Sequence, residues 1–170
     1  MNDSMIKVAI LTLSDKGSRG EREDLGGPAI MEIVKKIGAS VKHYEIIPDE
    51  KELIKEKLID YSMKVDLIIT TGGTGLSPRD VTPDATLEVI DREIPGIAEA
   101  MRMEGLKKTD RAMLSRAVAG VRGTALIINL PGSPKAIREG LEAIVGVIPH
   151  AVEKIKGSTE DCAPVDRDAR

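Results

Sequence analysis

The feature that constrains this chain most is an aliphatic run that turns abruptly into glycine. Residues 65–69 are mostly aliphatic and β-branched, which is typical of a strand buried inside a parallel sheet. Residues 70–75 read Thr-Thr-Gly-Gly-Thr-Gly, and glycine lets the backbone take positive φ and approach a ligand closely. Thr82 followed by Pro83 then indicates an N-cap and a helix start. The order strand, glycine loop, helix predicts a ligand site at the carboxyl end of this strand.

The rest of the chain alternates between strand-like and helix-like segments. Further strands are expected at residues 5–13, 41–47, 115–122 and 124–130, the last two around Gly123. Helices are expected at residues 30–37, 48–63, 83–94, 97–106 and 133–155, with a kink at Pro149, and residues 14–24 read as a polar loop. This alternation predicts an α/β fold, a three-layer α/β/α sandwich around a mostly parallel sheet. We assign residues 1–156 to one domain and residues 157–170 to a polar C-terminal tail.

Composition narrows the classes of partner. The chain has two tyrosines and no Phe or Trp, so it has few side chains on which bases could stack. Its net charge of −3 also argues against a general nucleic-acid-binding surface. An anionic ligand therefore needs local N–H groups, a helix N-terminus or a metal ion. His43 and His150 lack the spacing of metal ligands, and Cys162 is the single cysteine. Without a secretory signal or an apolar run of membrane-spanning length, we expect a cytoplasmic protein that contacts no membrane.

Four predicted strand ends carry unusual residues, and parallel strands bring such ends to one rim of a sheet. They are Ser14, Asp49, the loop Thr71, Gly72, Gly73, Thr74 and Gly75, and the turn Pro131, Gly132 and Ser133. Two familiar phosphate motifs are excluded there. The loop lacks the Gly-Lys-Ser/Thr ending of a P-loop. It also lacks the third glycine of the dinucleotide fingerprint.

Two aspartates suggest a different way to hold a polyphosphate. Asp80 follows the glycine loop and Asp49 lies at the neighbouring strand end, and two carboxylates facing bound phosphates are a usual arrangement for Mg²⁺. Structural interpretations remain open beside this one. Asp49 with Glu52 could form a capping box, and Asp80 could satisfy local N–H groups.

The other candidates also have structural interpretations. Ser133 could be only an N-cap, the glycines only a tight turn, and Ser115 only a strand-edge residue. Arg79 and Lys135 could be ordinary solvated charges.

Taken in order, these motifs resemble the molybdopterin-binding family of MogA, MoaB and the gephyrin G domain. The resemblance spans about residues 6–155, and its most specific part is the glycine loop followed by Arg-Asp-Val-Thr-Pro at 79–83. Weaker parts are Leu-Ser-Asp at 13–15, Ile-Pro-Asp-Glu at 47–50, Leu-Ser-Arg at 114–116 and Asn-Leu-Pro-Gly-Ser-Pro-Lys at 129–135.

The resemblance implies adenylyl transfer: activation of molybdopterin with ATP and Mg²⁺, with release of pyrophosphate. It implies that Asp49 and Asp80 are the catalytic and metal-binding aspartates. It also implies that residues 71–75, Ser14, Ser115 and 131–133 contact substrate or nucleotide. A homotrimer and a separate molybdenum-insertion protein are further implications. The alternatives are a non-catalytic MoaB-like pterin-binding or scaffold protein, and a hydrolase acting on a nucleotide. The intact aspartate pair and the Leu-Pro-Gly-Ser-Pro-Lys segment at 130–135 favour the active class.

Overall fold

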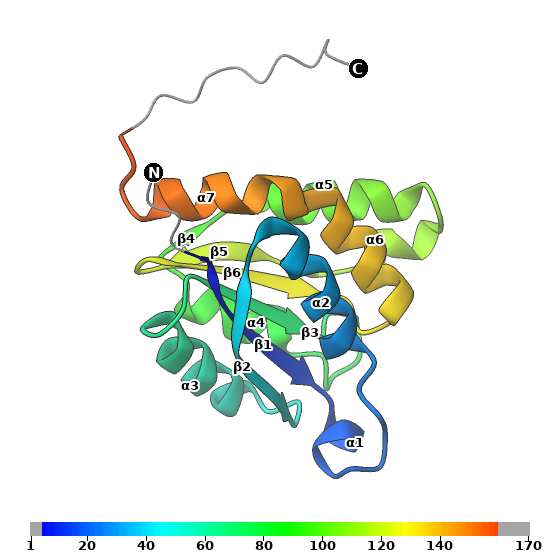
Figure 1. The fold of residues 1–170 in the computed structure, drawn as a ribbon. Coiled ribbons are helices and arrows are strands. Elements are labelled where there is room, and N and C mark those ends of the chain that lie inside the picture. Colours follow the sequence, from blue (N-terminus) through cyan, green and yellow to red (C-terminus); the bar gives the residue numbers. More distant parts are fainter. Residues whose placement is uncertain (1–4, 160–170) are drawn as a thin grey trace.

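A twisted six-stranded sheet forms the middle layer of the protein (Figure 1). The structure is a computed structural model, and it describes residues 5–159. The strands lie in the order β2-β1-β3-β6-β5-β4. Strands β2, β1, β3 and β6 run parallel, and β5 is antiparallel to both of its neighbours, β6 and β4. They are β1 (Lys7–Leu13), β2 (Ser40–Ile47), β3 (Leu67–Thr71), β4 (Arg92–Glu93), β5 (Ala119–Arg122) and β6 (Ala125–Leu130).

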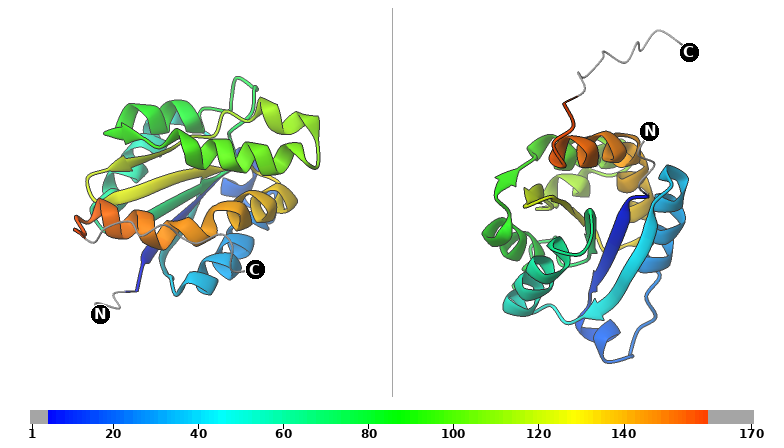
Figure 2. Two further views of the ribbon diagram at one scale, coloured as in Figure 1. Left: turned by 90° about the horizontal axis from the view of Figure 1, so that it is seen from above. Right: turned by 60° about the vertical axis from the view of Figure 1, so that its left-hand side comes forward.

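Helices cover both faces of the sheet, which confirms the predicted α/β/α sandwich (Figure 2). One face packs against α2 (Gly26–Val34), α5 (Pro95–Leu106), α6 (Pro134–Ile144) and α7 (Ile148–Ile155). The other packs against α3 (Lys51–Ser62) and α4 (Thr82–Val89). The remaining helical turns are α1 (Asp15–Ser18), η1 (Lys35–Ile37), η2 (Asp110–Leu114) and η3 (Val145–Val147). Because side chains alternate along a strand, Ile69 and Ile128 enter the first core and Ile68 and Ile127 the second.

Strand β3 lies between β1 and β6, and every one of its residues is buried. The predicted strand exists, although it runs from Leu67 to Thr71 rather than over 65–69. A strand that is covered on both faces has no solvent-facing positions, which explains why this segment is aliphatic without alternation. The glycine loop therefore leaves the sheet at its centre and not at an edge.

Several predicted boundaries were right and others need correction. Gly38 ends the first helical segment at φ +69°, and the last helix is interrupted by η3 just before Pro149. The polar loop after β1 contains the short helix α1, because the Ser14 hydroxyl accepts from the N–H of Gly17 and caps it. The helix begun near Pro83 ends at Val89, well before Ile94-Pro95, and the unpredicted strand β4 follows it.

The hairpin around Gly123 is confirmed, with Gly123 at φ +55°, but its first strand begins at Ala119 and not at Ser115. Residues 157–159 continue no helix, and the rest of the predicted tail, with Cys162, lies outside the described residues. Among residues 5–159, no helix is both long and apolar enough to span a bilayer.

Candidate functional site

A hollow of about 370 Å³ opens at the carboxyl ends of the parallel strands. Eight of the sequence-predicted site residues line it: Ser14, Asp49, Thr71, Gly72, Gly73, Asp80, Gly132 and Ser133. They come from the ends of β1, β2, β3 and β6 and from the loop before α4. The predicted convergence at one rim is therefore present, and it includes both candidate aspartates.

Two of the loop glycines are required by the backbone itself. Gly72 has φ +99°, and a Cβ there would lie 2.4 Å from the carbonyl oxygen of Leu13. Gly73 has φ +63°, and a Cβ would lie 2.4 Å from Oγ1 of Thr82 and 3.1 Å from Oδ1 of Asp49. These two residues keep the loop against the end of β1 and leave space beside the Asp49 carboxylate.

The third glycine of the loop, Gly75, is required for a different reason. The sequence suggested that glycine serves here to allow positive φ, and for Gly75 this is wrong. Gly75 does not have positive φ, but a Cβ there would lie 2.9 Å from Oδ2 of Asp80. The N–H of Gly72 donates to the carbonyl of Leu130 at 3.1 Å, so it is not available to a ligand. Within residues 5–159, the N–H of Gly73 has no protein acceptor and remains able to bind an anion.

Asp49 does not form the capping box that its spacing from Glu52 allowed. Helix α3 begins at Lys51 after Glu50, whose side chain makes no capping hydrogen bond. The Asp49 carboxylate instead accepts from the N–H of Asp15 at 3.0 Å. This contact joins the end of β2 to the start of α1 and positions Asp49 at the hollow.

Asp80 is held by its own turn. Its Oδ2 accepts from the N–H of Ser77 at 2.9 Å, and its N–H donates to the carbonyl of Ser77 at 2.8 Å. The expectation that Asp80 satisfies local N–H groups is therefore correct for Oδ2, which accepts from Ser77. Asp80 also lines the hollow, as Asp49 does, so the turn holds Asp80 at the hollow that the two aspartates share.

Burial of the Asp49 carboxylate raises its pKa, and the negative charges of Asp15 and Asp80 add to this effect. Arg79 and the hydrogen bond from Asp15 oppose it. A divalent cation would offset the burial of the Asp49 charge and the repulsion that Asp49 experiences from its neighbours, so the residues at this hollow fit Mg²⁺. No cluster of three or more His, Cys, Asp or Glu suited to a metal occurs among the described residues.

Hydroxyl groups at the rim also have local partners. Thr71 donates to the carbonyl of Pro131 at 2.7 Å, which ties β3 to the turn after β6. Ser133 caps α6 by accepting from the N–H of Ala136 at 3.3 Å, as the N-cap interpretation predicts. Ser14 caps α1 in the same way. These side chains shape the hollow whether or not they touch a ligand.

Four predicted residues lie at a second, neighbouring hollow of about 300 Å³: Thr74, Gly75, Ser115 and Pro131. Helices α5 and α6 and the η2 turn form the rest of its wall, with apolar side chains such as Ala98, Met101 and Leu114. Ser115 accepts from the N–H of Ala117 at 3.3 Å and is not at the edge of a strand. The glycine loop and the turn after β6 therefore separate a carboxylate-bearing hollow from a largely apolar one.

Sequence reasoning missed several polar residues around the first hollow. Arg79 forms a bidentate ion pair with Asp15, at 2.7 and 3.0 Å, and so is not simply solvated. This pair lowers the pKa of Asp15. Asp24 accepts from Thr12, Gly26 and Gly27 at 2.8–3.1 Å and from the hydroxyl of Tyr44. Aspartate two residues before Gly26-Gly27-Pro28 was a readable helix-start signal.

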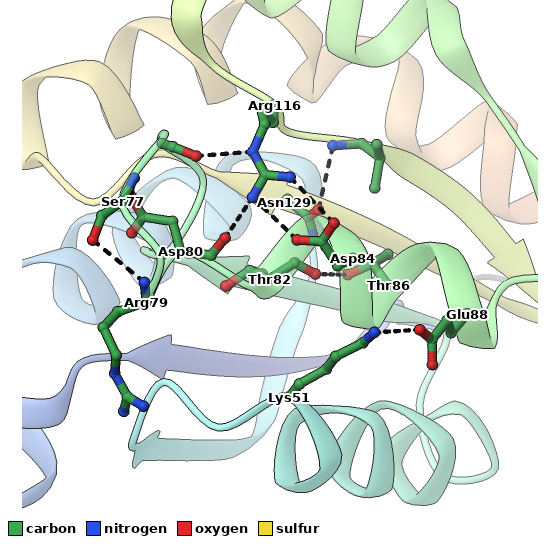
Figure 3. A network of polar contacts seen from close by, with 12 residues as sticks. Lys51, Ser77, Arg79, Asp80, Thr82, Asp84, Thr86, Glu88, Arg116 and Asn129 are labelled. Carbon is green, nitrogen blue, oxygen red and sulfur yellow. Dashed lines mark hydrogen bonds and ion pairs between the residues drawn. The ribbon is translucent and has the colours of Figure 1, made fainter.

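A network of fully buried polar side chains connects the glycine loop to β3, β6 and α4 (Figure 3). The amide of Asn129 donates to the hydroxyls of Thr70 and Thr86 at 3.0 Å. Thr86 donates to the carbonyl of Thr82, and the Thr82 hydroxyl donates to the carbonyl of Gly72. Thr82 is thus inside α4 after Val81 and is not the N-cap that the sequence suggested.

Fold and site together define an α/β protein with a loop-lined hollow at the carboxyl ends of its parallel strands. The sequence matches the family described as probable molybdopterin binding domain over residues 9–150. The chain belongs to this family.

Individual relatives agree with this assignment. The chain is 46% identical to a molybdopterin adenylyltransferase of Helicobacter pylori strain J99, over 90% of this chain and 89% of the relative. It is 38% identical to the molybdopterin adenylyltransferase of Escherichia coli K12, over 94% and 90%. The crystal structure of the molybdopterin biosynthesis enzyme MoaB from Thermus thermophilus superposes with a TM-score of 0.84. It shares 54% identity over 91% of this chain and 98% of that one.

Proposed function

We propose that this protein is a molybdopterin adenylyltransferase of molybdenum cofactor biosynthesis, which uses Mg-ATP and releases pyrophosphate. The observation that carries the proposal is the meeting of Asp49 and Asp80 at one hollow beside Gly73. Family membership and relatives named for this activity support it.

The two hollows suit a substrate pair with charged and ring-shaped parts. The first offers the Gly73 N–H, the rim hydroxyls and two carboxylates, which suit phosphates accompanied by a cation. The second offers an apolar wall that suits a flat heterocycle, as in pterin or adenine. The glycine loop lies between them, so a phosphate joined to a ring could occupy both.

The proposed reaction needs little acid–base chemistry. An oxygen of the terminal phosphate of molybdopterin forms a bond to the α-phosphorus of ATP, and the bond from that phosphorus to the β-phosphate oxygen breaks. Pyrophosphate leaves with the electron pair. Because the nucleophile is already anionic, the protein has to position two anions and offset their repulsion.

Asp49 and Asp80 are the residues that would hold Mg²⁺, and the ion would supply positive charge against the phosphates. The loop brings Gly73 to the same hollow, and the ion pair of Arg79 with Asp15 lies next to Asp49 through the Asp15–Asp49 hydrogen bond. Both carboxylates are fixed by backbone donors, Asp15 N–H for Asp49 and Ser77 N–H for Asp80, so they need little reorganisation.

The proposal extends to the surroundings of the enzyme. We place the reaction in the cytoplasm, where ATP is available, and expect a homotrimer by family resemblance. A separate protein would insert molybdenum into the adenylylated product.

The test is incubation of the purified protein with molybdopterin and Mg-ATP, followed by detection of adenylylated pterin and pyrophosphate. Both products should appear in equal amounts. A non-catalytic pterin-binding protein, with the same hollow but no turnover of ATP, is the second candidate. Tight pterin binding with neither product formed would support that candidate and contradict ours.

A further inference from the structure

Arg116 ties together the two ends of the exposed turn that carries Asp80 (Figure 3). Its Nε donates to the carbonyl of Gly75 at 2.9 Å, and its Nη2 donates to the carbonyl of Asp80. Its own backbone N–H donates to the carbonyl of Thr74 at 2.9 Å. Residues 76–79 between these anchors are exposed to solvent.

The other edge of the same guanidinium is held by Asp84 in the first turn of α4. Nη1 and Nη2 donate to the two oxygens of Asp84 at 3.2 and 3.1 Å. A planar fork with donors on two edges can hold two carbonyls and a carboxylate at once, whereas a lysine ammonium cannot reproduce that geometry. The turn is thereby fixed to a helix of the core.

Arg116 is not among the residues that line either hollow, and its guanidinium donates to the carbonyls of the loop and to Asp84. We therefore expect its effect on chemistry to pass through the loop. Without the fork, both carbonyls lose their partner and the exposed turn gains freedom to move. The position of Asp80 relative to Asp49 would then no longer be fixed.

We propose that Arg116 is a positioning residue for adenylyl transfer, which holds the turn of residues 75–80 so that Asp80 stays at the hollow that it shares with Asp49. This inference rests on the proposed function for its catalytic part. The positioning of the turn can be measured without any turnover.

The first measurement is hydrogen–deuterium exchange of Arg116→Ala, Arg116→Lys and Asp84→Asn. Arg138→Ala is the matched control, because Arg138 forms an ordinary ion pair with Glu32 on the surface. Both Arg116 variants should exchange faster in residues 74–80 while β3 and β6 stay protected. Asp84→Asn should change less, since both bonds to the loop carbonyls remain. Unchanged exchange in residues 74–80 of a folded Arg116→Ala protein would overturn the proposal, and so would faster exchange throughout the chain.

The second measurement separates rate from binding. Arg116→Ala and Arg116→Lys should lower kcat about tenfold to a hundredfold, the scale of a small misplacement of a catalytic group. The Mg²⁺ concentration for half-maximal rate should rise several-fold, with metal-free molybdopterin affinity unchanged. Wild-type kcat and Mg²⁺ dependence in Arg116→Ala would overturn a catalytic role. If the wild-type protein forms no adenylylated pterin, the proposed function fails, and the exchange experiment still decides whether Arg116 holds the turn.

Discussion

Asp15 and Asp49 exchange two hydrogen bonds: the N–H of each donates to the carboxylate of the other at 3.0 Å. This reciprocal pair joins the turn after β1 to the turn after β2. It brings the Asp49 carboxylate to the hollow at the expense of the helix cap that Asp49 could have formed. Arg79 completes the arrangement by pairing with Asp15.

The raised pKa of Asp49 gives a prediction for stability against pH. Since the folded-state pKa lies above the unfolded value, the folded state binds more protons between the two, and stability falls as pH rises through that window. Asp49→Asn removes the charge and keeps an oxygen that can accept from Asp15. Without metal it should raise Tm at neutral pH, and the gain should vanish below the ordinary pKa of aspartate. Thermal melts from pH 3 to 8 in chelator measure this, and an Asn variant less stable than wild type at pH 7 would contradict it.

The aspartate pair also gives the sharpest test of chemistry. Asp80→Asn keeps an acceptor for the Ser77 N–H and removes the charge. It and Asp49→Ala should stay folded and bind molybdopterin, while adenylyl transfer falls at least about a hundredfold, the scale of losing one electrostatic group. Pterin titration and turnover with Mg-ATP are the measurements. Near wild-type turnover for Asp80→Asn would mean that its carboxylate only closes the turn.

The glycine loop predicts a contrast between two Gly→Ala changes. In Gly73→Ala the methyl group would meet Thr82 and Asp49 in a backbone with positive φ, so we expect destabilisation of about 1–3 kcal/mol and impaired substrate binding. Gly96→Ala is the control, because its methyl would meet nothing within 4 Å and alanine favours helix. Urea unfolding should place Gly96→Ala at or slightly above wild type. Equal stabilities for the two variants would show that the loop tolerates a side chain.

Replacement of Asn129 is expected to lower the free energy of unfolding strongly, because its side chain makes three buried hydrogen bonds. Asn129→Leu would leave the N–H of Val118 and the hydroxyls of Thr70 and Thr86 without their buried partner. Loss of about 2–3 kcal/mol of unfolding free energy is expected, on the scale of stranded buried polar groups. Thr86→Ser, which keeps the hydroxyl, should lose clearly less. Chemical denaturation of the three proteins checks this, and a wild-type midpoint for Asn129→Leu would contradict it.

The chain by itself determined the layers of this protein and the rim at which the site lies. The aliphatic run before the glycines indicates a strand that is covered on both faces of a sheet. The alternation of such strands with amphipathic helices indicates that the sheet is mostly parallel. Since parallel strands end at one edge, Ser14, Asp49, Gly72 and Ser133 could be grouped from their positions in the sequence.

Tertiary structure alone decided which partner each polar group took. Asp49 could cap α3 or bind the N–H of Asp15, and Thr82 could cap α4 or donate to Gly72. Side chains of this kind can bond either to a nearby helix N-terminus or to a distant backbone group, so local sequence allows both alternatives. The choice depends on where β1, β2 and β3 lie side by side. Arg116 lies about forty residues after Gly75 in the chain. It reaches the glycine loop because the segment that leads into β5 is held in place by the pairing of β5 with β6. Such contacts come from packing between distant segments, which no local pattern encodes.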